Sequence, residues 1–170
     1  LDILVNNAGG MLRPAERNTP TAMPEDDYRF ILDINLTGTV FCCQAAVPLM
    51  RQAGWGRIVN IASGAAIGAL GSMECYGIAK AGIVHYTRSL AREVASWGIN
   101  VNCLAPALIG TSRAFAQFPE RRNAGPSIPL GRVGVPEDCA KVVEFFCTDL
   151  SDYVTGQVLP VCGGLITHGI

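Results

Sequence analysis

Charged residues are scarce in this sequence, and the two signs nearly balance. Asp, Glu, Lys and Arg make up 16% of the 170 residues, and the formal net charge is −1. A chain with this balance lacks the basic surface that nucleic acid binding requires. The low charge and the 49% hydrophobic content indicate a sheet that helices cover on both faces. We expect no nucleic acid partner.

Long apolar runs are also lacking. The sequence has no 18 consecutive apolar residues of the kind that span a bilayer, and its first residues do not form a basic stretch followed by an apolar one. We therefore expect no membrane partner.

Metal-binding and disulfide patterns are missing as well. His85 and His168 are the only histidines, and no Cys-x-x-Cys pair occurs. Such a pattern excludes a structural zinc site, and we expect no metal. Seven cysteines without a disulfide framework are typical of a protein in the reducing cytoplasm, which is where we expect this one.

Predicted strands and helices alternate along the chain. Apolar strand patterns cover 1–6, 57–61, 101–104 and 157–161, and helical patterns cover 24–52, 75–97 and 136–146. The first helical pattern fits either one long helix or a broken one. This alternation predicts a single α/β domain over 1–170, with a parallel sheet between two helical layers.

Tyr76 and Lys80 are the most informative pair of residues. They lie four positions apart in a predicted helix, so their side chains share a face, with Cβ atoms about 5–6 Å apart. A phenol ionises near pH ~10, and a neighbouring cation stabilises the phenolate. The pair therefore predicts a Tyr76 with a lowered pKa, suited to proton transfer in alcohol and carbonyl chemistry. The alternative for Lys80 is a surface side chain that extends along the helix to water.

Several polar or special residues follow predicted strands directly. Asn7, Ser63 and Pro106 each stand just after one, and the carboxyl ends of parallel strands form the edge of a sheet where ligands bind. We expect these residues to gather at one site with the start of the Tyr76 helix. For Ser63, the alternative is a loop serine that bonds to the backbone.

Fixed spacings connect these residues to others. Ser63 lies thirteen positions before Tyr76, Asn35 lies twenty-eight positions before Ser63, and Asn6-Asn7-Ala8-Gly9 follows the first apolar run. Together with Thr155-Gly156-Gln157 near the end, this pattern resembles the short-chain dehydrogenase/reductase family. The resemblance implies a Rossmann-like, doubly wound α/β/α fold and an NAD(P)-dependent oxidoreductase acting on a secondary alcohol or ketone.

The resemblance also implies a catalytic tetrad. Ser63 would hydrogen-bond the substrate oxygen, and Tyr76 would transfer the proton. Lys80 would hold the nicotinamide ribose and lower the pKa of the phenol, while Asn35 would position a water that connects Lys80 to solvent. A buried helix amide is the alternative for Asn35.

Further contacts follow from the same resemblance. Residues implied to contact NAD or NADP, besides Tyr76 and Lys80, are Asn7, Ala8, Gly9, Pro106, Ile109 and Thr111. The region around 107–130 would bind a small-molecule alcohol or ketone, and helices near 35–52 and 75–97 would pair between subunits of a homodimer or homotetramer. Within the substrate region, we interpret Arg121 and Arg122 as a solvated face rather than as contacts of an acidic substrate.

One family feature is not found in the chain. Relatives begin with a strand, a glycine-rich turn and a helix that seat the dinucleotide pyrophosphate, whereas no Gly-x-Gly-x-x-Gly occurs here. We therefore interpret the chain as the C-terminal two-thirds of such an enzyme, with the N-terminal strands missing. The alternative is a truncated, non-catalytic remnant that serves as a binding or structural module.

Overall fold

A computed structural model of the chain, which describes residues 1–68 and 73–167, contains one parallel sheet between helices. Its strands are β1 (Ile3–Asn6), β2 (Gly56–Ile61), β3 (Ile99–Pro106) and β4 (Val158–Val161), which lie side by side in this order. All three neighbouring pairs are parallel, and Val59 of β2 lies opposite Val5 of β1 and Asn102 of β3. The predicted α/β architecture is confirmed.

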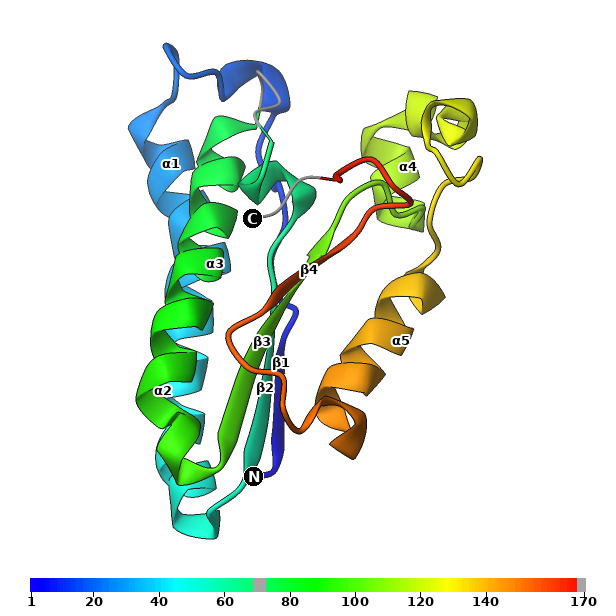
Figure 1. Ribbon diagram of the computed structural model, residues 1–170. Helices are drawn as coiled ribbons and strands as arrows, with labels where there is room; N and C mark the ends of the chain where they lie inside the picture. The colour runs from blue at the N-terminus through cyan, green and yellow to red at the C-terminus, as the bar shows by residue number, and fades with distance from the viewer. Residues whose placement is uncertain (69–72, 168–170) are drawn as a thin grey trace.

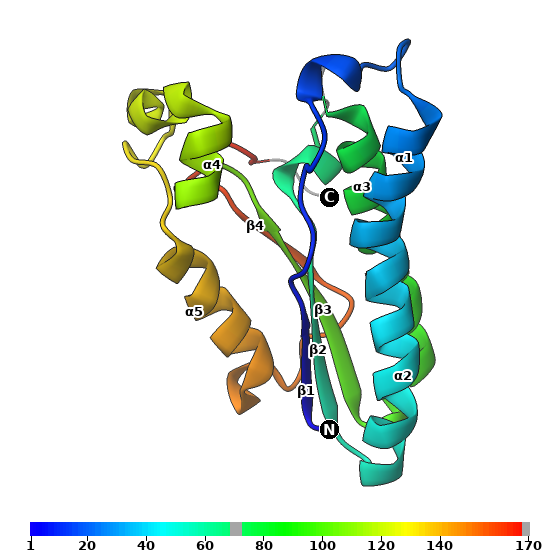
Figure 2. The same cartoon turned by 180° about the vertical axis from the view of Figure 1, so that it is seen from behind.

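Helices cover both faces of this sheet, as the sequence predicts. They are α1 (Glu25–Leu32), α2 (Gly38–Ala53), α3 (Glu74–Val94), α4 (Ser112–Gln117) and α5 (Pro136–Cys147). Figures 1 and 2 show α1, α2 and α3 together on one face and α5 on the other, with α4 beyond the carboxyl ends of the strands. Short 3₁₀ helices span Ala15–Arg17, Gly64–Ala66, Ala95–Trp97, Pro119–Asn123, Gly125–Ser127 and Asp149–Ser151.

The helical segment predicted over 24–52 is continuous, as one long helix would be, but its winding is interrupted, as in a broken helix. One π-helical stretch, Asp33–Thr37, joins α1 to α2, so the backbone stays helical from Glu25 to Ala53 but changes its winding around Asn35. Such π-bulges are rare in proteins, and those that occur often lie at functional sites.

This long segment also has the length and composition of a membrane-crossing helix. In the fold, however, it packs against the strands and α3, and Ile31, Cys43, Ala46 and Met50 on its inner side are buried. The core helix of an α/β domain meets the same criteria, and we assign the segment to that class.

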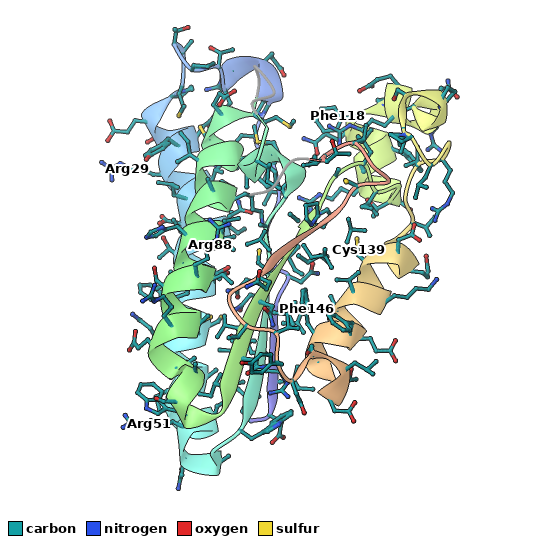
Figure 3. All side chains as sticks on the ribbon, in the orientation of Figure 1. Arg29, Arg51, Arg88, Phe118, Cys139 and Phe146 are labelled. Carbon is teal, nitrogen blue, oxygen red and sulfur yellow. The ribbon has the colours of Figure 1, made fainter. Side chains whose placement is uncertain are left out.

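The largest hydrophobic cluster lies between the sheet and the α2–α3 layer. Apolar side chains of α2, β2, α3 and β3 meet there, among them Met50, Ile58, Val94 and Val101. On the opposite face Phe146 of α5 points toward the strands (Figure 3) and is 2% exposed. Because β2 is buried along nearly its whole length, the sheet forms a rigid platform below its carboxyl edge.

Gly98 ends the second helical segment, in agreement with the helical pattern over 75–97. It adopts φ +75, and a Cβ there would lie 2.2 Å from the Gly54 carbonyl oxygen. Gly54 itself ends α2 with φ 68. The two helix ends therefore approach so closely that the turn at Gly98 requires glycine.

Candidate active site

A cavity of about 650 Å³ opens at the carboxyl edge of the sheet. Loops after β1, β2 and β3 form its walls, together with the start of α3 and with α4. Eight residues assigned to the site from the sequence line it, namely Asn7, Gly9, Ser63, Tyr76, Lys80, Pro106, Ile109 and Thr111. Two others, Ala8 and Asn35, do not.

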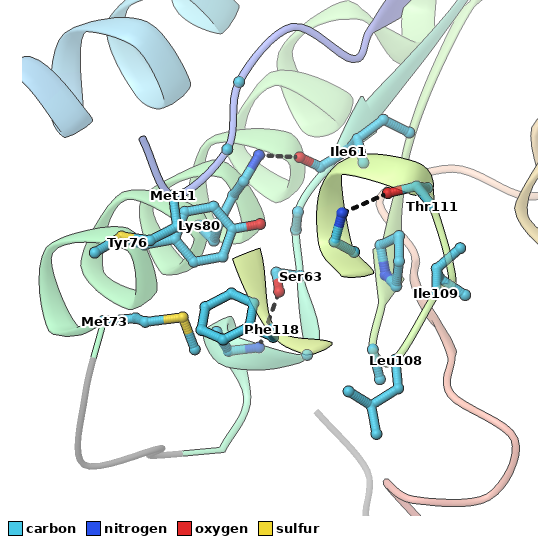
Figure 4. A pocket seen from close by; sticks show the side chains of 18 of the residues that line it. Met11, Ile61, Ser63, Met73, Tyr76, Lys80, Leu108, Ile109, Thr111 and Phe118 are labelled. Atoms are coloured by element: carbon cyan, nitrogen blue, oxygen red, sulfur yellow. Dashed lines mark hydrogen bonds between the residues drawn. The ribbon is translucent and has the colours of Figure 1, made fainter. Parts of the chain in front are cut away.

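Tyr76 lies in the first turns of α3, which begins at Glu74 after the cavity-lining Met73. Figure 4 shows its hydroxyl pointing toward the interior of the pocket, beside Ser63 and Phe118. The first residue of α3 is held by Asn18, whose carbonyl accepts from the Glu74 amide at 3.0 Å. The Asn18 side chain also accepts from the Cys75 thiol at 2.7 Å. These bonds set the position at which α3 enters the site.

Lys80 lies one turn after Tyr76 and is only 3% exposed. Its Nζ donates to the Ile61 carbonyl oxygen at 2.7 Å and lies 5.5 Å from the centroid of the Tyr76 ring (Figure 4). The two side chains are thus together, and the alternative of a solvent-directed lysine is wrong. Burial lowers the pKa of Lys80 to about 8.

The predicted lowering of the Tyr76 pKa is not found. Burial raises the pKa of Tyr76 above its ordinary value, and this effect exceeds the opposing influence of the Ser63 hydroxyl and of Arg113 and Arg121. The Lys80 ammonium lies over the ring rather than at the hydroxyl, and it already bonds to a carbonyl. The helix spacing predicts the proximity of the two side chains correctly, but it carries no information on the desolvation of both groups, which sets their pKa values.

Ser63 follows the last residues of β2 and caps the short helix Gly64–Ala66. Its Oγ accepts from the Ala65 amide at 3.2 Å, so the bond to the backbone that was the alternative interpretation is present. The same hydroxyl lines the cavity and lowers the pKa of Tyr76. Capping holds Ser63 in place, and its remaining hydrogen-bonding capacity faces the pocket.

Asn35 is fully buried in the π-helical stretch, behind the cavity wall. Its Nδ2 donates to the carbonyls of Ile31 at 2.9 Å and Gly10 at 3.2 Å, and its Oδ1 accepts from the Gly10 amide at 2.9 Å. The protein itself therefore satisfies this amide, as the buried-amide alternative requires. The role of Asn35 in positioning a water stays a prediction.

Gly9 packs between Asn35 and Lys80. It adopts φ +146, and a Cβ at this position would lie 2.5 Å from the Asn35 Oδ1 and 3.6 Å from the Lys80 Nζ. Glycine is required here because the backbone passes closely over both groups. Asn35 thus contacts the site indirectly, because the backbone of residues 9 and 10 lies between its side chain and the cavity.

Most of the residues assigned to cofactor contacts line the cavity. Thr111 caps α4 by accepting from the Ala114 amide at 3.0 Å, and it lines the pocket together with Pro106 and Ile109 (Figure 4). Asn7 is exposed and also lines it, whereas Ala8 is exposed outside the lining.

Two features of the site were missed in the sequence. Arg121 lines the cavity and is half-buried, with its guanidinium 3.9 Å from the centroid of the Phe118 ring, so its interpretation as a solvated residue is wrong. Arg122 is exposed, as expected. Asn6 supports the sheet beside the site, because its Nδ2 donates to the Asn60 Oδ1 at 2.8 Å between β1 and β2. Arg121 lies between residues 108 and 130, where the sequence carries no motif of the family. Only its position three residues after Phe118 could have indicated the stacking contact between the two side chains.

Comparison with known proteins agrees with this geometry. A family model described as enoyl-(acyl carrier protein) reductase matches residues 1–166. The cyclohexanol dehydrogenase of Rhodococcus sp. (strain TK6) is 42% identical over 169 residues, which are 97% of this chain and 63% of that protein. The 3-oxoacyl-[acyl-carrier-protein] reductase of Chlamydia pneumoniae is 44% identical over 167 residues, which are 97% and 65%. The chain thus spans less than two thirds of the length of these relatives.

Solved structures superimpose on nearly all of the chain. A 3-oxoacyl-[acyl-carrier protein] reductase from Brucella melitensis, with bound NAD, gives a TM-score of 0.87 at 32% identity and covers 99% of this chain and 63% of that one. An oxidoreductase of the short chain dehydrogenase/reductase family from Burkholderia thailandensis gives 0.87 at 32% identity, with 99% and 66% covered. On the family match, the shared fold and the relatives together, the chain belongs to the short-chain dehydrogenase/reductase family.

Proposed function

We propose that this chain carries the catalytic side chains of an NAD(P)-dependent oxidoreductase that interconverts a secondary alcohol and a ketone. The observation that carries the proposal is the meeting of Ser63, Tyr76 and Lys80 at one cavity. The names of the relatives, a cyclohexanol dehydrogenase and a 3-oxoacyl-[acyl-carrier-protein] reductase, support the same reaction class.

The residues present fit the nicotinamide end of such a cofactor. The cavity of about 650 Å³ has room for this part of the cofactor and a small substrate. Gly9 lines this cavity, and Lys80 offers a buried ammonium for a ribose hydroxyl. The rest of the nicotinamide end would contact Asn7, Pro106, Ile109 and Thr111. When bound, the cofactor supplies or accepts a hydride.

Tyr76 supplies the proton in the direction of ketone reduction. Negative charge that develops on the carbonyl oxygen is stabilised by the hydroxyls of Ser63 and Tyr76, both of which line the cavity. Because burial raises the pKa of Tyr76, the phenol is protonated at neutral pH and ready to donate. Alcohol oxidation needs the phenolate as base, so in that direction we expect activity to rise with pH.

Lys80 supports this proton transfer from behind the phenol. With a pKa of about 8 it is mostly protonated at pH 7, and its charge favours the phenolate when Tyr76 loses its proton. Asn35 would complete a path to solvent through the backbone at Gly10, to which its amide is bonded.

The outer faces of α2 and α3 fit a second copy of the chain. Phe41 and Leu49 on α2 are 61% and 52% exposed, and Ile78 on α3 is 44% exposed. Isologous packing of these helices would bury this apolar surface, so we propose a homodimer or homotetramer. Native mass spectrometry of the complete gene product measures the subunit number directly.

A cytoplasmic location is part of the same proposal. All seven cysteines are free thiols, and Cys43, Cys75 and Cys103 are buried as small apolar residues. Free thiols of this kind persist in a reducing compartment. Fractionation of cells that express the tagged gene product tests the location.

The decisive experiment compares Tyr76→Phe with the wild-type complete gene product. The variant removes the proton donor and keeps the ring, so we expect the rate of NAD(P)H oxidation with cyclic ketones to fall by at least about 100-fold. Tyr153→Phe, at a fully exposed position, is the matched control and should keep the wild-type rate. The alternative function, a non-catalytic binding module, requires instead that Tyr76→Phe and the wild type behave alike.

A further inference from the structure

The wall of the active-site cavity carries charge of one sign. Among the lining residues in the described parts of the chain, the charged ones are Lys80, Arg113 and Arg121, and none is Asp or Glu. This contrasts with the whole sequence, whose net charge is −1. A cleft lined by one sign of charge concentrates ligands of the opposite sign.

Arg121 is a partly buried cation of this wall that stacks on an aromatic ring and lacks a carboxylate partner among the described residues. It is half-buried on the 3₁₀ helix Pro119–Asn123, and its guanidinium stacks on Phe118 at 3.9 Å from the ring centroid. Within residues 1–68 and 73–167, it forms no ion pair with a carboxylate. Burial is the largest influence on its pKa and lowers it, and the neighbouring Glu120 opposes this through space only.

Arg113 provides a second cation at the rim of the cavity. Its Nη2 would lie 2.8 Å from a Cβ placed on Gly10, so the guanidinium rests beside the loop after β1. It too has no carboxylate partner among the described residues. Both arginines lower the pKa of Tyr76, so their positive field reaches the proton-transferring group.

A half-buried guanidinium without a carboxylate partner gives up part of its hydration and gains no counter-charge in return. Stacking on an aromatic ring offsets part of this loss. A carboxylate or phosphate offsets more of it, because the planar fork of arginine binds such groups through two parallel hydrogen bonds. Arg121 is therefore arranged for an anion that enters the cavity with the ligand.

Apolar side chains line the cavity together with Arg121. Among them are Phe118, Met73 and Met11, which are labelled in Figure 4. Met73 is the non-glycine residue at positive φ in the described chain, with φ 68. Strain of this kind gathers at ligand-binding sites, and here it belongs to a residue of the pocket wall.

We propose that the substrate is a ketone or secondary alcohol with an apolar body and an anionic group, which the guanidinium of Arg121 binds, with Arg113 as a second cation at the rim. Phe118 and Met73 would pack against the apolar body while Ser63 and Tyr76 face the reacting oxygen. This inference rests on the proposed oxidoreductase function and narrows its substrate class.

The test uses pairs of substrates that differ only in charge. The complete gene product is assayed with phenyl- and cyclohexyl-substituted oxo acids and with their methyl esters, and the ratio of kcat/KM for acid to ester is measured. We expect the wild type to prefer the acid. Arg121→Gln should lower the ratio about 10- to 100-fold, the range for loss of a charge-assisted hydrogen bond. Arg121→Lys, which keeps the charge without the fork, should lower it less.

Arg122→Gln is the matched control. Arg122 is the next residue in the chain, stacks on Phe115 at 4.6 Å from the ring centroid, and does not line the cavity. Its substitution should leave the acid-to-ester ratio at the wild-type value. Coenzyme A thioesters of the same acids form a third arm, which separates a carboxylate near the reacting carbon from phosphates on a distant carrier. A ratio of thioester to ester that falls in Arg121→Gln assigns the anion to the carrier.

Two results would overturn the inference. One is a wild type that handles acid, thioester and ester equally well. The other is an Arg121→Gln variant whose KM for NAD(P)H rises while the charge preference stays constant, because the arginines would then serve the cofactor. Calorimetric binding of the acids and esters to wild type and Arg121→Gln reports the charge preference without turnover. Failure of this inference is thus distinguishable from failure of the oxidoreductase function.

Discussion

The ammonium group of Lys80 lies 5.5 Å from the centroid of the Tyr76 ring and donates to the carbonyl of Ile61 rather than to the phenol. The chain therefore keeps two desolvated proton-transfer groups next to each other, each with its pKa moved toward the neutral form. Because both shifts come mainly from burial, they have consequences for stability as well as for catalysis.

The first prediction concerns the pH dependence of stability. Lys80 has a pKa of about 8 in the fold against an ordinary value of 10.5, so between these values the unfolded chain binds the proton more strongly. Stability should therefore rise with pH across this window, by about 3 kcal/mol for this group. We expect the free energy of unfolding of the wild type, minus that of Lys80→Met, to increase between pH 7 and pH 10 in urea titrations. Lys141→Met, at the exposed second lysine, should show no such trend.

The second prediction concerns Asn18, which is fully buried and joins the loop after β1 to the start of α3. Its side chain accepts from the Cys75 thiol and donates to the Pro14 carbonyl, each at 2.7 Å. Asn18→Ala leaves both groups without this partner and should cost about 1–3 kcal/mol in denaturant unfolding. It should also lower kcat of the complete gene product, because Tyr76 follows Cys75 directly. Asn123→Ala, at an exposed asparagine, is the control, and an equal loss there would contradict the proposed role.

The third prediction concerns Gly9. A methyl group at this position would collide with the Asn35 Oδ1, and φ +146 is unfavourable for alanine. We expect Gly9→Ala to lose about 1–3 kcal/mol of stability and most of the reductase activity, since Asn35 and Lys80 both border the site of the clash. Gly38→Ala, in a helix where a Cβ meets only an ordinary contact at 3.5 Å, should be neutral or slightly stabilising. Similar losses in both variants would show that the packing around Gly9 is not special.

The fourth prediction concerns the ion pair between Arg57 and Asp152. Arg57 is 5% exposed on β2 and stacks on Trp55, at 4.8 Å from the ring centroid, while Asp152 is largely exposed. Asp152→Asn leaves a buried guanidinium without its counter-charge, and we expect a loss of about 1–3 kcal/mol, discounted for the exposure of Asp152. Asp149, on the short 3₁₀ helix that ends just before Asp152, lacks such a partner in the described chain, so Asp149→Asn should change stability by less than about 0.5 kcal/mol. Thermal unfolding of the three proteins at one pH measures the difference.

Local sequence patterns determined the elements of this fold. The apolar strand patterns and the helical patterns marked most strand and helix ends within a few residues of those observed. They also placed Tyr76 and Lys80 on one helix face and put Asn7, Ser63 and Pro106 at strand ends. Such features follow from chain geometry over a few residues, which is why the sequence sufficed.

Only the tertiary structure decided how these groups behave. Burial raises the pKa of Tyr76, whereas the sequence predicted a lowered one. The Asn35 side-chain amide is hydrogen-bonded to Gly10 and Ile31. Arg121, which we expected at the surface, lines the pocket. Desolvation and the choice of hydrogen-bond partner depend on segments far apart in the chain. The desolvation and the hydrogen-bond partners of these groups are set by the packing of the loops after the strands at the carboxyl edge of the sheet.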